Sequence, residues 1–277
     1  MQQISGKVVV ITGGYGVLCG AMAKTLVQNG AKVAIVGLVK EEADAFISTI
    51  EAPNGVMLGF GANVLDKQSI ETVHQQILAN WGPCDILING AGGNHPNGTT
   101  DRPFMNEGDI NNDAIKSFFD LDPAGFQFVF ELNLLGTLIP SQVFAQDMIG
   151  RKGCSIINIS SLSAFKPLTK VPAYSGAKAA VSNFTHWLAV HFAKMGIRVN
   201  AIAPGFFLAD QNRALLTNSD GTLTPRGQQI IDQTPMGRFG EPEDLLSTLA
   251  WLLDDGSAFV TGVIVPVDGG FTAYAGV

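Results

Sequence analysis

The chain has 277 residues, of which 46% are hydrophobic, so it is long and apolar enough to form one large domain with a substantial core. Its formal net charge of −7 and the lack of a run of lysines and arginines argue against a nucleic-acid partner. Its three widely spaced cysteines include no Cys-x-x-Cys pair, so we expect three small buried side chains and neither a disulfide framework nor a metal site.

The N-terminal residues run from Met1 into an apolar segment at Val8 without the cationic region and cleavage site of a signal peptide. No apolar run in the sequence suggests a helix that spans a bilayer. These features predict a cytoplasmic protein with no membrane partner.

Short apolar runs rich in β-branched residues recur along the chain and predict buried strands at residues 8–12, 32–36, 56–60, 85–89, 155–159, 198–202 and 263–267. Between most of them the pattern predicts helices, at residues 21–29, 67–80, 126–149, 173–195 and 242–253. Strands that alternate with helices predict an α/β fold, a single-domain, doubly wound parallel sheet of the Rossmann type. Ligands of such a sheet bind at the carboxyl edge of the strands.

Two long intervals interrupt this alternation within the single domain expected for residues 1–277. Residues 93–122 form a polar insert rich in Asn, Asp, Gly and Pro, and residues 205–240 form a second interval before the last predicted helix. Loops of this length in a compact domain are usually functional or disordered. Because both begin where a strand ends, we expect the insert and a substrate lid at the ligand edge.

A glycine-rich turn follows the first predicted strand, at residues 12–20, and leads into a helix predicted to open at Ala21. Glycines permit a tight turn and a close approach to a pyrophosphate, while a helix N-terminus offers free N–H groups. An ordinary strand-to-helix turn has the same composition. The position directly after the first strand favours a nucleotide site.

The second predicted strand ends without the acidic residue that normally holds the adenosine ribose of NAD. Residues 36–40 read Val-Gly-Leu-Val-Lys. Lys40 either meets the 2′-phosphate of NADP or is a solvated lysine that begins a helix. The sequence therefore leaves the choice between NAD(H) and NADP(H) open.

Tyr174 and Lys178 are four residues apart and therefore share one helical face. Alone, this spacing is little better than a chance match. The strand predicted at residues 155–159 ends at Ser160 and Ser161, however, which brings a hydroxyl to the carboxyl edge near the tyrosine helix.

With Asn133, these residues resemble the short-chain dehydrogenase/reductase family, whose pattern is a serine, a tyrosine thirteen residues later, a lysine four beyond it and an upstream asparagine. Further family-like segments are Asn-Gly-Ala-Gly at 89–92, Pro-Gly at 204–205, Thr-Gly at 261–262 and Val-Asp-Gly-Gly at 267–270. The resemblance covers essentially the whole chain. It implies an NAD(P)-dependent oxidoreductase that forms a homo-oligomer, either a dimer or a tetramer.

The resemblance implies a catalytic role for each member of the set Asn133, Ser161, Tyr174 and Lys178. Tyr174 exchanges a proton with the substrate's carbonyl or hydroxyl oxygen, and Ser161 hydrogen-bonds the same oxygen. Lys178 holds the nicotinamide ribose, and its charge is expected to lower the pKa of the phenol. Asn133 anchors a water that relays protons.

The family's cofactor contacts map onto Thr12, Gly13, Tyr15, Gly16, Val17, Leu18, Lys40, Asn63, Val64, Asn89, Ala91, Gly92, Tyr174, Lys178, Pro204, Gly205 and Phe207. Four residues depart from the family pattern. Val17 and Cys19 stand where the glycine turn usually has its second and third glycines, so we expect a locally different turn. Asn63 replaces an aspartate that contacts adenine, and Ala209 replaces a threonine near the nicotinamide amide.

The insert at residues 93–122 is expected to lie beside the substrate. Candidate substrate ligands are Asn94, His95, Arg102, Ser161 and Arg213. Cations that flank the expected pocket and suit a carboxylate are Arg102, Lys166, Lys170 and Arg213. Each of these cations, taken singly, also fits an ordinary surface charge.

Residues 91–96, 158–161, 204–208 and 211–213 resemble one subgroup of the family, the short-chain type of D-mannonate oxidoreductase or fructuronate reductase. This resemblance implies a small sugar-acid substrate and the interconversion of D-fructuronate and D-mannonate. A reductase of another ketone, a sugar alcohol or a 3-oxoacyl thioester is the alternative within the family. A nucleotide-binding regulator without turnover is the alternative from another class.

Overall fold

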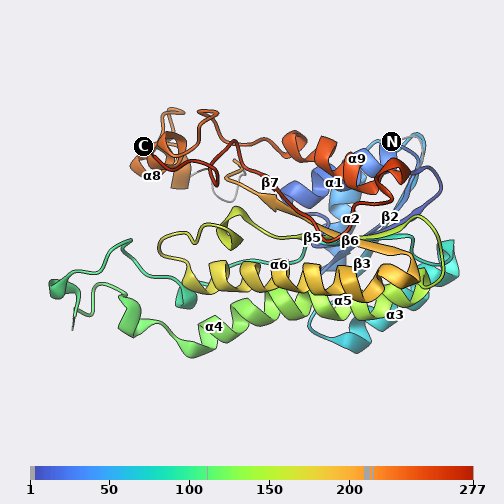
Figure 1. The fold of residues 1–277 in the computed structure, drawn as a ribbon, viewed down its shortest axis with the longest axis horizontal. Coiled ribbons are helices and arrows are strands. Elements are labelled where there is room, and N and C mark those ends of the chain that lie inside the picture. Colours follow the sequence, from blue (N-terminus) through green and yellow to red (C-terminus); the bar gives the residue numbers. More distant parts are fainter. Residues whose placement is uncertain (1–3, 111, 209–212, 214, 277) are drawn as a thin grey trace.

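The computed structural model describes residues 4–110, 112–208, 213 and 215–276 (Figure 1). In this part of the chain, seven parallel strands form one sheet in the order β3-β2-β1-β4-β5-β6-β7. The strands are β1 (Val8–Thr12), β2 (Lys32–Gly37), β3 (Val56–Gly61), β4 (Ile86–Asn89), β5 (Cys154–Ile159), β6 (Ile197–Pro204) and β7 (Ile264–Val267). The predicted α/β fold of the Rossmann type is confirmed, and each predicted strand lies within two residues of its observed ends. The strand order reverses between β1 and β4, where such sheets bind their ligands.

Helices cover both faces of the sheet (Figure 1). One face carries α1 (Val17–Gln28), α2 (Lys40–Ser48) and α9 (Leu246–Leu253), and the other carries α3 (Lys67–Trp81), α5 (Gly136–Phe144) and α6 (Pro172–Phe192). Successive residues of β1 alternate between the two cores: Val9 and Ile11 pack on the α1 side, Val8 and Val10 on the α3 side. A strand buried on both faces needs this uninterrupted apolar run.

The first helix begins earlier than predicted. Gly16 has an extended backbone conformation and caps α1, which starts at Val17 and not at Ala21. Two helices that the sequence pattern did not predict lie elsewhere in the fold, α2 and α8 (Pro225–Asp232). The start of α2 agrees with the interpretation of Lys40 as a helix-opening lysine.

The helix predicted at residues 126–149 consists of four consecutive pieces. α4 (Pro123–Phe130) leads into a π-helical segment (Glu131–Leu135), then into α5, and a 3₁₀ turn (Ala145–Met148) ends the run. Apolar periodicity does not distinguish an α from a π turn, and single π turns often occur at functional sites. The prediction of one continuous α-helix was therefore wrong.

The same run, Pro123–Met148, is long and apolar enough to cross a membrane by length and composition, with a mean hydropathy of 1.4, which the sequence analysis overlooked. Half of its most apolar window is buried inside the fold, where α4 packs on α6 and α5 packs on α3. The run therefore packs as a core helix does.

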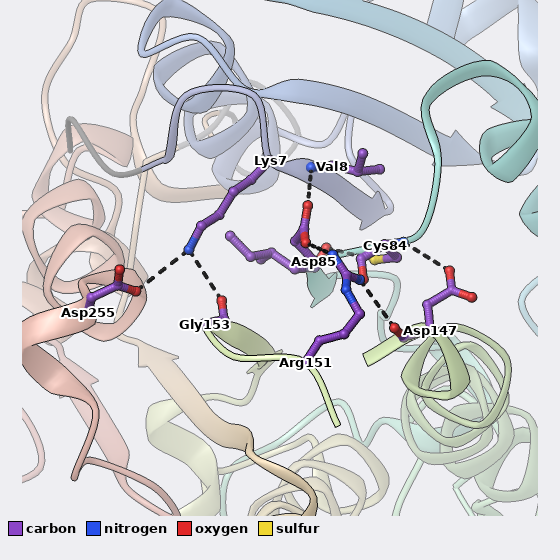
Figure 2. A network of polar contacts seen from close by, with 9 residues as sticks. Lys7, Val8, Cys84, Asp85, Asp147, Arg151, Gly153 and Asp255 are labelled. Atoms are coloured by element: carbon purple, nitrogen blue, oxygen red, sulfur yellow. Dashed lines mark hydrogen bonds and ion pairs between the residues drawn. The ribbon is translucent and has the colours of Figure 1, made fainter. Parts of the chain in front are cut away.

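Figure 2 shows a polar network at the amino edge of the sheet, away from the ligand edge. The Asp85 carboxylate accepts a hydrogen bond from the backbone N–H of Val8 at 2.8 Å and forms an ion pair with Arg151. Arg151 also donates to the carbonyl of Cys84, whose N–H donates to Asp147 at 2.9 Å. These contacts join the starts of β1 and β4 to the segment before β5. As predicted, Cys84 and the other two cysteines are buried and free.

Candidate active site

The base of the insert packs against the start of α6. A Cβ atom on Gly98 would lie 2.9 Å from the Cβ of Ala173, and the N–H of Thr100 donates to the carbonyl of Lys170 at 2.8 Å. Beyond Thr100 the insert extends away from the body of the molecule, past the ends of α4 and α6 (Figure 1). Gly98 and Thr100 therefore place the base of the insert against the start of α6, the helix that carries Tyr174.

The described residues of the interval 205–240 lie on the other side of the carboxyl edge from the insert and include α8 (Figure 1). Of the residues singled out in it, Ala209 and the segment 211–212 lie outside the described residues. Arg213 is described and exposed, and its carbonyl accepts a hydrogen bond from the N–H of Thr217.

The structure brings Ser161, Tyr174 and Lys178 together where β5 ends and α6 begins. Lys178 is 5% exposed, and its Nζ lies 5.6 Å from the centroid of the Tyr174 ring. The ammonium donates to the carbonyl of Ile159 at 2.8 Å, while the Tyr174 hydroxyl hydrogen-bonds with Ser161. The predicted sharing of one helical face is confirmed.

Burial governs the protonation of the Tyr174–Lys178 pair. Desolvation raises the pKa of Tyr174 above 10.0, although the hydrogen bond with Ser161 acts in the opposite direction. Desolvation also lowers the pKa of Lys178 from 10.5 to about 8. The net direction is therefore opposite to the lowered phenol pKa that we expected from the charge of Lys178, because the loss of water around the phenol is the larger effect.

Asn133 is buried in the π-helical segment, beside the first residues of the insert. Its Nδ2 donates to the carbonyls of Gly93 and Val129, both at 2.7 Å, and its Oδ1 accepts from the N–H of Gly93 at 3.3 Å. A Cβ atom on Gly92 would lie 2.6 Å from this Oδ1 and 3.2 Å from Lys178 Nζ. Only glycine fits where these two side chains converge.

The turn after β1 has the features of a pyrophosphate cradle. Gly13 has a φ of +62°, and a Cβ there would lie 3.0 Å from the backbone of Ala91. Thr12 Oγ1 accepts from the N–H groups of Gly90 and Ala91, which ties the turn to the end of β4. No side chain caps the α1 N-terminus and no acidic residue lies in its first turn, so its free N–H groups suit an anion. Gly16, Val17, Leu18 and Gly92 belong to the same two turns.

Cys19, which stands where the family pattern has a glycine, packs its side chain against Gly90. Its thiol occupies the space in front of Gly90, where a side chain at residue 90 would collide with it. Gly20, one residue beyond the third glycine position of the family pattern, lies against the ring of Phe46 on α2. Gly90, directly after β4, thus leaves the space that the side chain of Cys19 fills.

Asn89, a predicted cofactor contact at the end of β4, has a buried side chain that is hydrogen-bonded within the fold. It is 1% exposed, and its Nδ2 donates to Ser141 Oγ and Asn158 Oδ1, each at 2.9 Å. The side chain therefore joins β4 to α5 and β5 underneath the site.

The other predicted cofactor residues lie around the carboxyl edge. Asn63 is exposed after β3, and its Oδ1 accepts from the N–H of Leu65, while Val64 is buried against Gly136. Pro204 ends β6, and a Cβ on Gly205 would lie 2.6 Å from the backbone of Asp268. A cavity of about 420 Å³ beside them is lined in part by Phe206 and Phe207, and the four catalytic candidates are not among its lining residues.

Lys40 opens α2, is exposed and forms an ion pair with Asp44. Glu42, on the same first turn of α2, is a residue that the sequence analysis missed. Burial and, next, a hydrogen bond with Glu42 raise the pKa of Tyr15 in the glycine turn. In the sequence, the two acidic residues directly after Lys40, Glu41 and Glu42, could have indicated a carboxylate near the glycine turn.

The candidate substrate ligands have different environments. Asn94 is exposed and donates to Thr99, whereas the Nδ1 of His95 accepts from the N–H of Asn97 at 3.1 Å. Arg102 is already used, because its guanidinium donates to Asp109, which is 3% exposed, at 2.6 Å. Arg102 therefore helps to hold the outer part of the insert together through one nitrogen of its guanidinium.

Residues 7–220 match the family model described as short chain dehydrogenase. The chain belongs to the short-chain dehydrogenase family. As a member of it, the protein is an NAD(P)-dependent oxidoreductase.

Close relatives of this short-chain dehydrogenase span its whole length. An "Uncharacterized oxidoreductase" of Haemophilus influenzae is 54% identical over 99% of this chain and 96% of its own. "Uncharacterized oxidoreductase UxuB" of Bacillus subtilis is 53% identical over 100% of this chain and 98% of its own. A crystal structure with bound NAD, of a "putative D-Mannonate oxidoreductase" of Haemophilus influenzae, has a TM-score of 0.94 and 54% identity, and covers 99% of this chain and 97% of that one.

Proposed function

We propose that this short-chain dehydrogenase interconverts D-fructuronate and D-mannonate. The observation that carries the proposal is the packing of a polar insert against α6, one residue before Tyr174, at a site that keeps the complete family set Asn133, Ser161, Tyr174 and Lys178. The name of the Haemophilus structure supports the same substrate. A cytoplasmic location and a dimer or tetramer are part of the proposal.

The chain's own residues supply proton transfer and orientation in this reaction. Tyr174 donates its proton to the carbonyl oxygen of the keto acid, since burial keeps the phenol protonated. Ser161 hydrogen-bonds the same oxygen, and Lys178 holds the ribose beside it. When bound, the cofactor supplies the hydride to the carbonyl carbon. Asn133 in its π turn anchors the water that returns a proton to Tyr174.

We further propose that Lys170 binds the substrate carboxylate. Other nearby lysines are engaged: Lys116 donates to the carbonyl of Pro96, and Lys166 donates to that of Tyr274. Lys170 is half-buried four residues before Tyr174, with a φ of +74°. Within the described part of the chain, its ammonium has no hydrogen-bond or ion-pair partner. Such strain in a non-glycine residue is often found at functional sites.

Purified protein is expected to oxidise NADH or NADPH in the presence of D-fructuronate, measured as the loss of absorbance of the reduced cofactor. The same assay is run in parallel with other ketones, with ketoses that are reduced to sugar alcohols, and with a 3-oxoacyl thioester. Turnover of another substrate with none for D-fructuronate contradicts the sugar-acid proposal. If the protein binds the cofactor but reduces none of these carbonyl compounds, the result favours the alternative of a nucleotide-binding regulator without turnover.

Replacing Lys170 with asparagine is expected to raise KM for D-fructuronate by about 10-fold or more, because a charge-assisted contact contributes about 1.5–3 kcal/mol. Asparagine tolerates the left-handed backbone, so the fold is preserved. Steady-state kinetics measure KM, and calorimetry measures cofactor affinity, which should not change. Lys166→Asn is the matched control. An unchanged KM in Lys170→Asn contradicts the assignment.

A further inference from the structure

The outer part of the insert, residues 101–120, forms an arm with exposed aromatic rings. Phe104 is 77% exposed, Phe118 68% and Phe119 69%. Phe104 and Phe118 line one cleft of about 140 Å³, together with Met105, and the ring of Phe119 lies 5.5 Å from that of Phe118. The rings therefore form one group. An exposed apolar group of this kind marks an interaction surface more often than a scattered exposed residue does.

The arm is also acidic. Its sequence contains five acidic residues and two basic ones. Both basic residues are engaged within the insert, Arg102 by Asp109 and Lys116 by a backbone carbonyl. Within the described residues of the chain, the exposed carboxylates of Glu107 and Asp113 have no hydrogen-bond or ion-pair partner. The arm thus presents apolar rings and negative charge on the same surface.

A surface of complementary character lies at the C-terminal end of α6. Trp187, Val190 and Lys194 are three or four residues apart and therefore share one face of the chain there. This face points to solvent, since Trp187 is 57% and Val190 79% exposed. The N–H of Gly150 donates to the carbonyl of Met195 at 3.2 Å, which brings the segment before β5 beside the same helix end.

The charge of this helix end is positive. Residues 149–152 and 186–195 contain two lysines, one arginine, two histidines and no acidic residue. Within the part of the chain that the structure describes, the ammonium groups of Lys152 and Lys194 have no hydrogen-bond or ion-pair partner. We name the exposed residues of this end the basic patch, which consists of Ile149, Lys152, Trp187, Val190, Lys194 and Met195.

The arm and the basic patch of one chain lie too far apart to meet. The arm begins where Thr100 is bound to Lys170, at the start of α6, and extends away from the helix (Figure 1). The patch lies at the other end of α6, whose 21 residues span about 30 Å. A second copy whose α6 runs antiparallel brings its own patch to the arm. A two-fold axis across the helices forms this contact twice.

We propose that the arm of one copy docks on the basic patch of a second copy. Its phenylalanines pack on Trp187 and Val190, and its carboxylates lie beside Lys152 and Lys194. The inference rests on the dimer or tetramer that is part of the proposed function, and it adds the two surfaces that meet. Its tests contain no substrate, so a dimer that forms without this contact overturns the inference and leaves the proposed reaction untouched.

The first test is cross-linking between two full-length chains that each carry one new cysteine. Phe118→Cys and Val190→Cys proteins with different affinity tags are coexpressed and treated with a short bismaleimide. We expect a covalent heterodimer on a denaturing gel, and the three native cysteines are buried. Coexpression of Phe118→Cys with Lys24→Cys is the matched control, because the exposed Lys24 lies on α1 across the sheet. The control should give little or no product.

The second test measures self-association by sedimentation equilibrium over a dilution series. Phe118→Ser is expected to weaken association about 10-fold per arm, and therefore about 100-fold in the dissociation constant of a dimer with two arms. At low ionic strength, Glu107→Lys and Lys194→Glu should each weaken association at least about threefold, and the double variant should recover to within about twofold of wild type. Glu51→Lys, far from both surfaces, is the charge control and should have no effect.

Three results would each overturn the proposal. The first is the absence of the Phe118–Val190 cross-link, or an equal yield with Lys24→Cys. The second is a dissociation constant that Phe118→Ser leaves unchanged, which includes a wild-type protein that stays monomeric. The third is an effect of the two charge reversals that adds up in the double variant instead of cancelling. Thermal melting checks that every variant folds.

Discussion

Replacing Tyr174 with phenylalanine is expected to lower kcat for carbonyl reduction by a factor of about 10²–10⁴, because the substrate oxygen loses its proton donor. The ring itself stays, packed among Val129, Ala173 and Ala177, so the fold and the cofactor site should be preserved. Steady-state kinetics at saturating cofactor measure kcat, and calorimetry measures the Kd for the cofactor, which should remain within about twofold of wild type.

Tyr274→Phe is the matched control for this substitution. Tyr274 lies near the C-terminus, and its backbone carbonyl accepts a hydrogen bond from Lys166. The Tyr274→Phe substitution also removes a phenol hydroxyl, but it should leave kcat unchanged. If Tyr174→Phe retained the wild-type kcat, a different group would have to protonate the substrate, and the proposed mechanism would be wrong.

Lys178→Met is expected to abolish most activity and yet to stabilise the cofactor-free protein at neutral pH. The fall in the Lys178 pKa from 10.5 to about 8 means that the fold disfavours the charged amine. This penalty, about 3 kcal/mol at most, is fully present below pH 8 and disappears as the pH rises from 8 to 10.5. Losing the hydrogen bond to the Ile159 carbonyl costs about 1 kcal/mol, so a net gain of about 1–2 kcal/mol remains at pH 7.

Urea unfolding of the cofactor-free wild-type and Lys178→Met proteins at pH 7 and pH 10 measures this difference. The advantage of the variant should shrink or reverse at pH 10, where the wild-type lysine is neutral in the fold. Activity assays of the same samples should show a loss of about 100-fold or more in kcat/KM, since the group that holds the ribose is absent. A stability difference that does not depend on pH would contradict the lowered pKa.

The strands were predictable because a parallel sheet covered on both faces leaves continuous apolar runs in the sequence. The residues at which helices begin, and the interruptions within helices, were harder to predict. Gly16 reads as part of a loop, whereas its extended conformation starts α1 at the very next residue. The π turn around Asn133 leaves the apolar pattern of residues 126–149 unchanged, so the sequence could not reveal it.

The juxtaposition of Tyr174 and Lys178 followed from helical spacing, which is a local property. Their pKa values did not, because burial depends on what the rest of the chain packs around them. The ion pair of Arg102 could not be predicted for a similar reason: only the fold of the insert shows that Asp109, seven residues later, turns back to bind it. The effect of Glu42 on Tyr15 was missed because Glu42 lies in the helix after β2 and not in the strand itself.

The hydrogen bonds between Asn133 and Gly93 distinguish two parts of the insert, the junction at Gly93 and the outer part beyond residue 100, which tolerate substitution differently. Both backbone polar groups of Gly93 are bound by a residue of the proposed proton relay, so a shift at this junction would disturb the chemistry at once. The outer part is held by its own Arg102–Asp109 pair and by Lys116, which donates to the carbonyl of Pro96. Substitutions beyond residue 100 can thus change the substrate preference, whereas substitutions at the junction of Asn133 and Gly93 would also disturb the proton relay.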